Sequence, residues 1–397
     1  MGRKILPIII ILSLSFAACN RGIYAETDGI SAATARKGPT VQTLFQNIMP
    51  GAASDGIIKI AVLVNAVSDD NSRQFIEGCV SEGRSMGFTV DTFISGGDSD
   101  KCRKTAAGIA GADYDGLVFA YGGVDFTYDI LKPVTDSGIQ IVTFEALPYK
   151  DGKYLKGLVT TFRDDYNLAR LSLETLISFH PDRKPVRVIR FGCDPGITFL
   201  DRRAWVFDEF KNRGLIEEIA LITINSPDNP YDSAWDALAG ILPRFPPGSV
   251  DALWVPWDVF AGGFAGALEA AGRSDIKLVS IGISNDGIHL MLRHSRIWLA
   301  SAAIDLKLAG TVNMRILAAM LSGENPKEAF LFSPQLVKTP DLNYGININN
   351  ISMTVPGWGD GQGLFDHYQW MHDLKAAEGK YLRIPPEAGP VTAPDAP

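Results

Sequence analysis

Apolar runs and helix-like periodicities alternate along the chain from residue 57 to residue 322. The run "IIKIAVLV" at 57–64 is almost wholly apolar and largely β-branched, as expected for a strand covered on both faces. The segment "SRQFIEGCVSEGRSMGF" at 72–88 instead places apolar side chains at helical spacings, which predicts a helix that ends at Gly87. Strands that alternate with helices are joined by right-handed crossovers and predict a parallel sheet.

The alternation occurs in two successive stretches of domain size. In the first, further elements are expected at 88–95, 100–111, 115–121, 126–137 and 139–145. In the second, they are expected at 157–162, 164–179, 186–192, 199–213, 218–225, 231–242, 251–256, 258–272, 277–283, 285–293, 297–304 and 305–322. The sequence therefore predicts an α/β fold with two successive units. Residues 345–397 break the pattern; they are rich in Asn, Gly and Pro, and one helix is expected near 363–377.

The chain begins with an apolar run behind two basic residues. Arg3 and Lys4 precede a mostly apolar stretch at 5–18, which is shorter than the ~20 residues of a membrane span and is typical of an export signal. The pair Ala17–Ala18 before Cys19 resembles the lipobox of bacterial lipoproteins, a family in which the cysteine is acylated and becomes the new N-terminus. This resemblance implies lipidation at Cys19. Simple secretion and an uncleaved anchor are the alternatives.

The charge composition and the absence of catalytic motifs argue against several classes of protein. The 397 residues carry 45 acidic and 37 basic side chains, a formal net charge of -8, so nucleic-acid binding is not expected. The sequence has no GxSxG, no P-loop, no CxxC and no GxGxxG after its first strand. The pairs His289/His294 and His367/His372 have an i, i+5 spacing, which is not the i, i+4 spacing of a helical metal site. No catalysis, cofactor or metal is therefore predicted.

Six segments, in their order along the chain, resemble the ribose- and galactose-type (type I) periplasmic binding proteins. They are "IKIAVLVN", "FIEGCVSEGRSMGFTV", "YDGLVFA", "IVTFE", "RRAWVFDEF" and "AGALEAAGRSDIKLVSIGI". The resemblance covers about residues 57–340. It implies two doubly wound parallel-sheet lobes, joined by a three-crossing hinge, with a ligand held between them. Related lactose-repressor-type regulators carry an N-terminal helix-turn-helix, whereas an export signal occupies that end here.

The resemblance also implies a division of the chain into segments. The expected segments are a signal peptide with its lipobox (1–19), a tether with at most one weak helical turn (20–55), lobe one (56–163 plus 306–333), lobe two (164–305 plus 334–345) and a C-terminal extension (346–397). The expected crossings between the lobes lie near 162–165, 304–306 and 332–336.

The cysteines of the two lobes are expected to stay unpaired. Cys79 and Cys102 belong to helices that right-handed crossovers place on opposite faces of one sheet. A bridge across a sheet exceeds the ~4.4–6.8 Å Cα separation of a disulfide. Cys193 is expected in the other lobe.

The residues that follow the strands are the candidate ligand contacts, because ligands bind beyond the carboxyl ends of parallel strands. In lobe one these are Asn65, Asp69, Asn71, Tyr121, Asp125 and Glu145. At the hinge and in lobe two they are Asp165, Arg203, Trp257, Asp258, Ser284 and Asp305. Carboxylates, amides and arginine pair with hydroxyl groups, and an aromatic face covers the C–H side of a sugar ring. This mixture favours a neutral, polyhydroxylated ligand.

Several of these positions have a second interpretation. Helix capping is the alternative role for Asp69, Asp70, Asn71, Asp165, Asn285 and Asp286. Trp254 lies inside a strand and is expected in the core. Arg203 matches the family's sugar-binding arginine, and its neighbour Arg202 is a rival for that role.

Four positions depart from the family's ribose binders. Ala146, Trp257, Ser284 and Asp305 stand where those proteins have arginine, asparagine, aspartate and glutamine. The pocket contents therefore differ, and a hexose, a deoxysugar, a polyol or another small polar metabolite is expected rather than ribose.

The resemblance implies an exported solute-binding protein at the periplasm or cell surface. It is expected to act as a monomer that delivers its ligand to an ABC permease in the inner membrane, without a cofactor. A sensor subunit that presents the ligand to a membrane histidine kinase or chemoreceptor is the alternative with the same fold. An exported α/β enzyme is the third hypothesis.

Overall fold

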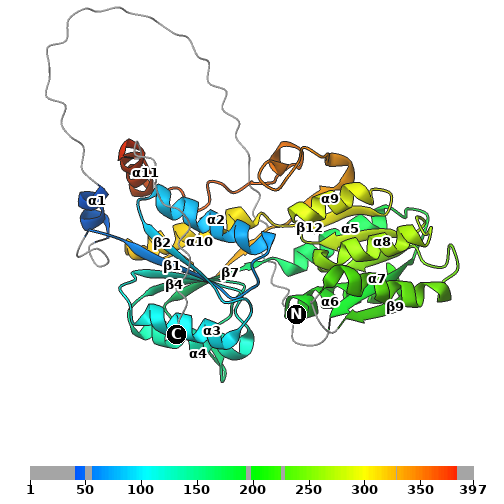
Figure 1. Cartoon of the computed structure of the whole chain (residues 1–397), viewed down its shortest axis with the longest axis horizontal. Coiled ribbons are helices and arrows are strands. Elements are labelled where there is room, and N and C mark those ends of the chain that lie inside the picture. Colours follow the sequence, from blue (N-terminus) through cyan, green and yellow to red (C-terminus); the bar gives the residue numbers. More distant parts are fainter. Residues whose placement is uncertain (1–40, 50–55, 194–197, 225–228, 328, 382–397) are drawn as a thin grey trace, which may run out of the picture. The chain divides into compact units, whose positions relative to one another are not determined.

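The computed structural model of the chain describes residues 41–49, 56–193, 198–224, 229–327 and 329–381. Within these ranges the chain forms two six-stranded sheets with helices packed on both faces of each (Figure 1). This confirms the predicted fold class, two lobes of doubly wound α/β sheet. No helix in the described part of the chain is long and apolar enough to cross a membrane.

The first sheet, which we call lobe one together with its helices, is parallel throughout. Its strand order is β13-β7-β4-β3-β1-β2. The bounds are β1 (Lys59–Val64), β2 (Thr89–Ile94), β3 (Gly116–Ala120), β4 (Gln140–Phe144), β7 (Leu158–Arg163) and β13 (Ala329–Phe332), with the separate hairpin β5 (Tyr149–Lys150) and β6 (Lys153–Tyr154). The inner strands β1, β3 and β4 are buried on both faces, which explains their continuous apolar runs.

Two pairs of helices cover the two faces of this sheet. Helices α2 (Asp70–Ser85) and α10 (Leu306–Leu321) lie on one face, and α3 (Ser99–Ala110) and α4 (Val124–Asp136) lie on the other (Figure 1). The backbones of α2 and α10 approach closely at two glycines. A Cβ on Gly78 would lie 2.0 Å from the carbonyl oxygen of Lys307, and one on Gly310 would lie 2.0 Å from that of Phe75.

The second sheet, lobe two with its helices, has the strand order β14-β12-β11-β10-β8-β9. Its strands are β8 (Val186–Cys193), β9 (Ile216–Ile224), β10 (Ala252–Val255), β11 (Lys277–Ile281), β12 (Trp298–Ala303) and β14 (Gln335–Lys338), of which β14 runs antiparallel to β12. Its helices are α5 (Asp165–Ser178) and α6 (Thr198–Asn212) on one face, and α7 (Pro230–Ile241), α8 (Ala261–Ala270) and α9 (Asn285–Arg293) on the other. Short 3-10 helices lie at Leu242–Arg244, Asp258–Phe260, Thr339–Asp341 and Ile351–Met353.

The chain passes between the two sheets at three places. The first crossing leads from β7 at Arg163 into α5 at Asp165. The second leads from β12 at Ala303 into α10 at Leu306, and the third leads from β13 into β14 across residues 333–334. Each crossing is only a few residues long, so the ends of the strands that flank the hinge are held near one another.

Lobe one includes a helix in the segment that was expected to be a tether. Helix α1 (Val41–Ile48) buries Phe45, whose ring lies 5.8 Å from that of Phe88 between centroids, and Met49 is buried with it. The expected single weak turn is therefore a two-turn helix that packs on the core. The folded part of the chain begins before residue 56.

The C-terminal segment packs on both lobes. We call residues 342–381 the strap. Its first half contributes Ile346, Ile351 and Trp358 to the apolar core of lobe two. Helix α11 (Gln369–Tyr381) lies against α1 and α2, where Lys375 Nζ lies 2.7 Å from Glu82 Oε1.

The helix expected near 363–377 begins later than predicted, at Gln369. Phe365, which lies inside the expected helix, has a positive φ of 55°. A backbone in this conformation cannot continue into a helix, which explains the difference.

Cys79 and Cys102 are free and buried. Cys79 belongs to the core cluster beneath α2 and α10, and Cys102 belongs to the cluster on the opposite face of the same sheet. Cys193 ends β8 in the other lobe. The sheet separates the first two thiols, as the crossover argument predicts.

The close contact of α2 with α10 makes Gly78 a sensitive position. We expect Gly78→Ala to lower the free energy of unfolding by roughly 1–3 kcal/mol, because the new Cβ would overlap a backbone carbonyl. Urea unfolding followed by circular dichroism measures the change. The control is Gly108→Ala in α3, where a Cβ meets nothing within 4 Å, so stability should be unchanged or rise by about 0.5–1 kcal/mol. Equal losses in both variants would contradict the packing described.

Candidate functional site

A small cavity lies where carboxyl ends of strands from the two sheets face one another. Its volume is ≈ 40 Å³. It is lined by Asn71, Arg163, Leu168, Arg203, Trp257, Asp258, Ile281, Gly282, Ile283, Ala303, Ile304 and Leu306. We call it the cleft cavity. Its place at the strand ends is the one that parallel α/β sheets use for ligands.

Asp165 holds two arginines on one wall of the cleft. Its Oδ1 accepts a hydrogen bond of 2.8 Å from Arg203 Nε, and its Oδ2 accepts one of 2.8 Å from Arg202 Nε. Burial alone would raise the pKa of Asp165, but Arg203, Arg163 and Arg202 outweigh it and hold the pKa below its usual value. The carboxylate therefore stays charged and orients both guanidinium groups.

The two arginines serve different surfaces. Arg203 is 2% exposed, donates to the carbonyl oxygen of Pro256 and lines the cleft cavity. Arg202 lines a larger hollow of ≈ 620 Å³ at the first crossing, which residues of both lobes form, Leu331 and Trp205 among them. Of the two rivals, only Arg203 lines the cleft cavity.

Glu145 orients a third arginine at the end of β7. Its Oε1 accepts from the backbone N–H of Arg163 at 2.5 Å, and its Oε2 lies 3.3 Å from Arg163 Nη2. The Nε of Arg163 is buried and has no hydrogen-bond partner among the described residues. Because buried polar atoms are nearly always paired, this donor is available to a ligand in the cavity that Arg163 lines.

Two aromatic rings complete this wall. The ring of Phe199 lies 4.7 Å from the guanidinium carbon of Arg203 and 5.1 Å from that of Arg163. Trp257 meets Phe199 edge to face, with 5.4 Å between centroids. These contacts fix the position of the indole, and cation–π attraction adds to the stability of the cluster.

Asp258 brings a buried carboxyl group to the same cavity. Burial raises its pKa to about 7, although Arg203 opposes the shift. Gly282 lies directly against it, because a Cβ there would be 2.2 Å from Asp258 Oδ1. The positive φ of 109° at this position likewise favours glycine.

Lobe one contributes an amide from the start of α2. Asn71 lines the cavity, and its Oδ1 is buried without a hydrogen-bond partner in the described part of the chain. It therefore supplies an acceptor to the cavity that Arg163 and Arg203 also line. The neighbouring Asp69 caps α2 by accepting from Ser72 N at 2.7 Å, so the capping interpretation applies to Asp69 and not to Asn71.

Other predicted residues of lobe one have structural partners nearby. Asn65 donates to the carbonyl oxygen of Tyr121 at 3.3 Å and accepts from Ser95 Oγ at 2.5 Å. Tyr121 packs edge-on against Phe144. Neither lines the cleft cavity. The side chain of Asp125 lies outside the described residues.

Two predicted residues of the lobe-two strand ends are helix caps. Ser284 Oγ accepts from Gly287 N at 3.0 Å at the start of α9, and Asp305 Oδ1 accepts from Leu308 N at 2.9 Å at the start of α10. Neither side chain lines the cleft cavity, which differs from the expectation. Asp305 lines a second cavity instead.

The candidate contacts that the structure brings together are thus Asn71, Arg203, Trp257 and Asp258, with Asp165 and Glu145 behind them. Sequence reasoning missed Arg163 and Phe199. Arg163 ends a strand at the hinge, so the strand-end rule applied to "GLVTTFR" would have found it. Phe199 has no comparable signal, because it lies within the first turn of a helix. Trp254 is buried in the core, as predicted, and donates to Ser172 Oγ.

The cleft cavity is lined by side chains that can bind a polar ligand. Its groups are hydrogen-bond donors, acceptors and aromatic faces that suit a polar ligand. In the described ranges no group of three or more His, Cys, Asp or Glu side chains is placed to hold a metal ion.

A family profile described as "Periplasmic binding protein domain" matches residues 60–325. The chain belongs to this family. No curated protein matches the chain.

Solved structures show the same fold. The crystal structure of a sugar ABC transporter from Yersinia enterocolitica subsp. enterocolitica 8081 is 30% identical, covers 83% of this chain and 97% of its own, and has a TM-score of 0.72. A 5-methylthioribose transporter solute binding protein from Thermotoga lettingae TMO was solved in complex with 5-methylthioribose. It is 23% identical, covers 80% of this chain and 97% of its own, and has a TM-score of 0.69. A Caulobacter myo-inositol binding protein bound to myo-inositol is 15% identical, covers 75% of this chain and 95% of its own, and has a TM-score of 0.61.

Asp258 makes the stability of this periplasmic binding protein depend on pH. Because its pKa rises from 3.8 to about 7 on folding, the folded state must ionise a buried carboxyl as the pH rises through this window, and stability falls. In Asp258→Asn this loss disappears. We expect the loss of unfolding free energy between about pH 4 and about pH 8 to be a few kcal/mol smaller than in the wild type, since one pKa unit corresponds to about 1.4 kcal/mol.

Urea unfolding at both pH values measures this effect. The matched control is Asp286→Asn, because Asp286 is exposed in the first turn of α9. Identical pH profiles for Asp258→Asn and the wild type would show that Asp258 is not held neutral.

Proposed function

We propose that the chain is an extracytoplasmic solute-binding protein that captures a sugar or sugar-like small polar ligand in the cleft and delivers it to an ABC importer. The observation that carries the proposal is the cleft cavity, where unpartnered polar atoms of Arg163 and Asn71 come together with Trp257 and Asp258. The 30% identity to a sugar ABC transporter supports it. The ligand leaves unchanged, since the cleft serves binding and not turnover.

The proposed contacts divide by chemistry. Arg163 and Arg203 donate to hydroxyl oxygens, and Asn71 accepts a hydroxyl proton. Asp258 donates when protonated and accepts when ionised. Trp257 covers the apolar C–H face of a ring. A ligand with hydroxyl groups on both sides of a small ring satisfies all of these groups.

Entry of such a ligand requires the lobes to separate. The cavity volume of ≈ 40 Å³ is far below the roughly 300 Å³ at which ligand pockets begin. Hydrogen bonds link the lobes at the rim: Asp70 Oδ2 accepts from Asn285 N at 2.7 Å, and Asp70 Oδ1 accepts from Asn285 Nδ2 at 3.2 Å. Opening breaks these bonds, and a bound ligand that touches both lobes favours a state in which the lobes close around it, with a cavity larger than ≈ 40 Å³.

Membership of the family is consistent with export. We propose that residues 1–19 direct export and that acylated Cys19 anchors the protein at the periplasmic or outer cell surface; both lie outside the described residues. Dual acylation gives stable membrane attachment without a spanning helix. The permease partner and the monomeric state belong to the same proposal.

Ligand capture is tested by a thermal-shift screen of sugars, polyols and nucleosides. A ligand at about 100 times its Kd should stabilise the protein by about 2.7 kcal/mol and raise Tm. Trp257→Ala should abolish the shift of a ligand that binds in the cleft, because the indole lines this cavity. Arg203→Ala should do the same, although it also weakens the folded state by removing a partner of Asp165.

Trp205→Ala is the matched control. Trp205 is 69% exposed on α6 and does not line the cleft cavity, so this variant should keep the full ligand-induced shift. If no ligand loses its shift in Trp257→Ala, or if the shift is lost equally in both tryptophan variants, the assignment of the cleft is wrong.

The lipid anchor is tested in cells. Cys19→Ser removes the thiol that would be acylated, so the protein should move from the membrane fraction to the soluble exported fraction and stop incorporating labelled palmitate. Cys102→Ser, a buried cysteine of the folded part, is the control and should keep its label. Unchanged membrane attachment of Cys19→Ser would refute anchoring at this residue.

A further inference from the structure

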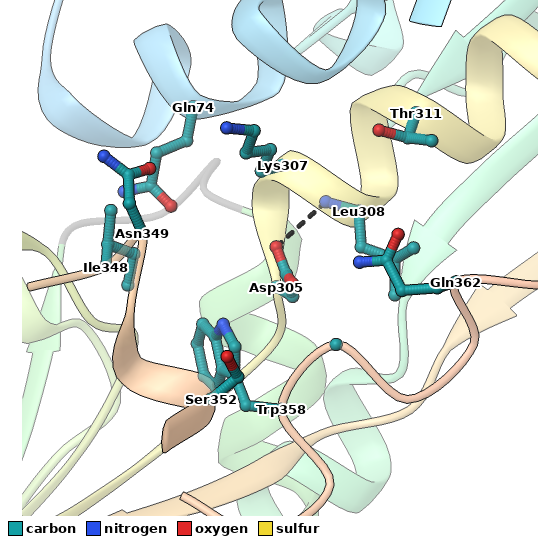
Figure 2. Close-up of a pocket in the computed structure, with 11 residues that line it drawn as sticks. Gln74, Asp305, Lys307, Leu308, Thr311, Ile348, Asn349, Ser352, Trp358 and Gln362 are labelled. Carbon is teal, nitrogen blue, oxygen red and sulfur yellow. Dashed lines mark hydrogen bonds between the residues drawn. The ribbon is translucent and has the colours of Figure 1, made fainter. Parts of the chain in front are cut away.

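A second cavity, of ≈ 220 Å³, lies beside the start of α10 (Figure 2). Helices α2 and α10 of lobe one form one side of it, and the strap forms the other. We call it the strap cavity. It shares no lining residue with the cleft cavity, so it is a separate site.

Gln74 of α2 points into the strap cavity toward Asn349 of the strap (Figure 2). The residue is 4% exposed, and its Nε2 has no hydrogen-bond partner among the described residues. A buried polar group left unpaired destabilises the folded state. A ligand acceptor in the cavity would remove this cost.

Asp305 supplies a strong acceptor on the same wall. One of its oxygens caps α10, and among the described side chains no cation forms an ion pair with its carboxylate. Lys307, which lines the same cavity, instead pairs with Glu77. Burial raises the pKa of Asp305, which shows that its carboxylate is poorly solvated. Hydroxyl donors of a ligand would compensate it.

The remaining walls fit a compact polar molecule. Trp358 of the strap is 6% exposed and presents its indole to the cavity, while Thr311, Ser352 and Gln362 add hydroxyl and amide groups. Asp305 and Lys307 are the charged lining residues, and their charges are opposite, so the cavity favours a neutral ligand. We propose that the strap cavity is a second binding site, for a small neutral molecule that carries several hydroxyl groups.

Such a ligand would touch parts that belong to different lobes. Gln74 and Thr311 lie on helices of lobe one, whereas Ile348 and Trp358 pack in the core of lobe two. Ile348 N also donates at 2.9 Å to Asn285 Oδ1, the residue that bonds Asp70 across the rim. Occupancy of the strap cavity therefore favours the lobe arrangement with the rim closed, and it couples to occupancy of the cleft.

Isothermal titration calorimetry on the full chain tests the site, with glucose, ribose, sorbitol and myo-inositol as probes. In Trp257→Ala, which impairs the cleft, at least one probe should still bind. Adding Ser352→Trp should abolish this event, because Ser352 is exposed at the mouth and an indole fills the cavity. The control is the double variant Trp257→Ala/Met353→Trp, which should keep the binding. Met353 is 78% exposed and does not line the strap cavity.

Asp305→Asn provides a second test that keeps the helix cap, because an asparagine oxygen also accepts from Leu308 N. In the Trp257→Ala background it should weaken binding about tenfold or more, since a hydrogen bond to a charged group is stronger than one to a neutral group.

Two results would overturn the proposal. One is that no probe binds Trp257→Ala up to its solubility limit. The other is a binding event in Trp257→Ala that neither Ser352→Trp nor Asp305→Asn changes. Both outcomes leave the cleft proposal standing, because that proposal is judged by whether Trp257→Ala itself abolishes a wild-type binding event.

Discussion

A cluster of buried ion pairs at the first crossing fixes the geometry of the cleft. It comprises Glu145, Arg163, Asp165, Arg202 and Arg203. Glu145 follows a strand of lobe one, while Arg203 lies on a helix of lobe two. Charges in this setting are tolerated only when they compensate one another, so loss of one partner leaves an uncompensated charge behind. The cluster thus holds the arginine side chains in one orientation, with the donor of Arg163 and the guanidinium of Arg203 at the cavity.

The strap adds a second connection between the lobes, made of apolar packing rather than charge. Trp358 and its neighbours complete the core of lobe two, and Met371 and Leu374 enter the core cluster beside α2. A type I lobe pair held only by three short crossings would leave the start of α10 open to solvent. Here the strap covers it and encloses polar side chains, which is how a cavity arises away from the strand ends.

Most of the fold was predictable from the sequence because parallel strands buried on both faces leave unmistakable apolar runs. The strand-end rule likewise selected Arg203, Trp257 and Asp258, which line the cleft cavity. The rule does not separate residues that line the cleft cavity from residues that cap a helix. Ser284 and Asp305 follow strands just as Asp258 does, and the sequence alone does not show which role a side-chain oxygen has. The strap was not predictable, because its turns have no period and its packing depends on both finished lobes.

The glycine contact between α2 and α10 has a mechanical consequence. With two backbones pressed together at Gly78 and Gly310, α10 cannot slide or tilt against lobe one without a steric clash. Because α10 starts directly after the second crossing, lobe one and α10 rotate together as one rigid body. Opening then requires torsion at Ile304, at Asp305 and at the other two short crossings, together with a shift of the strap where it passes from lobe two to α11, so a small torsion at the crossings swings the far rim of the cleft through a large arc.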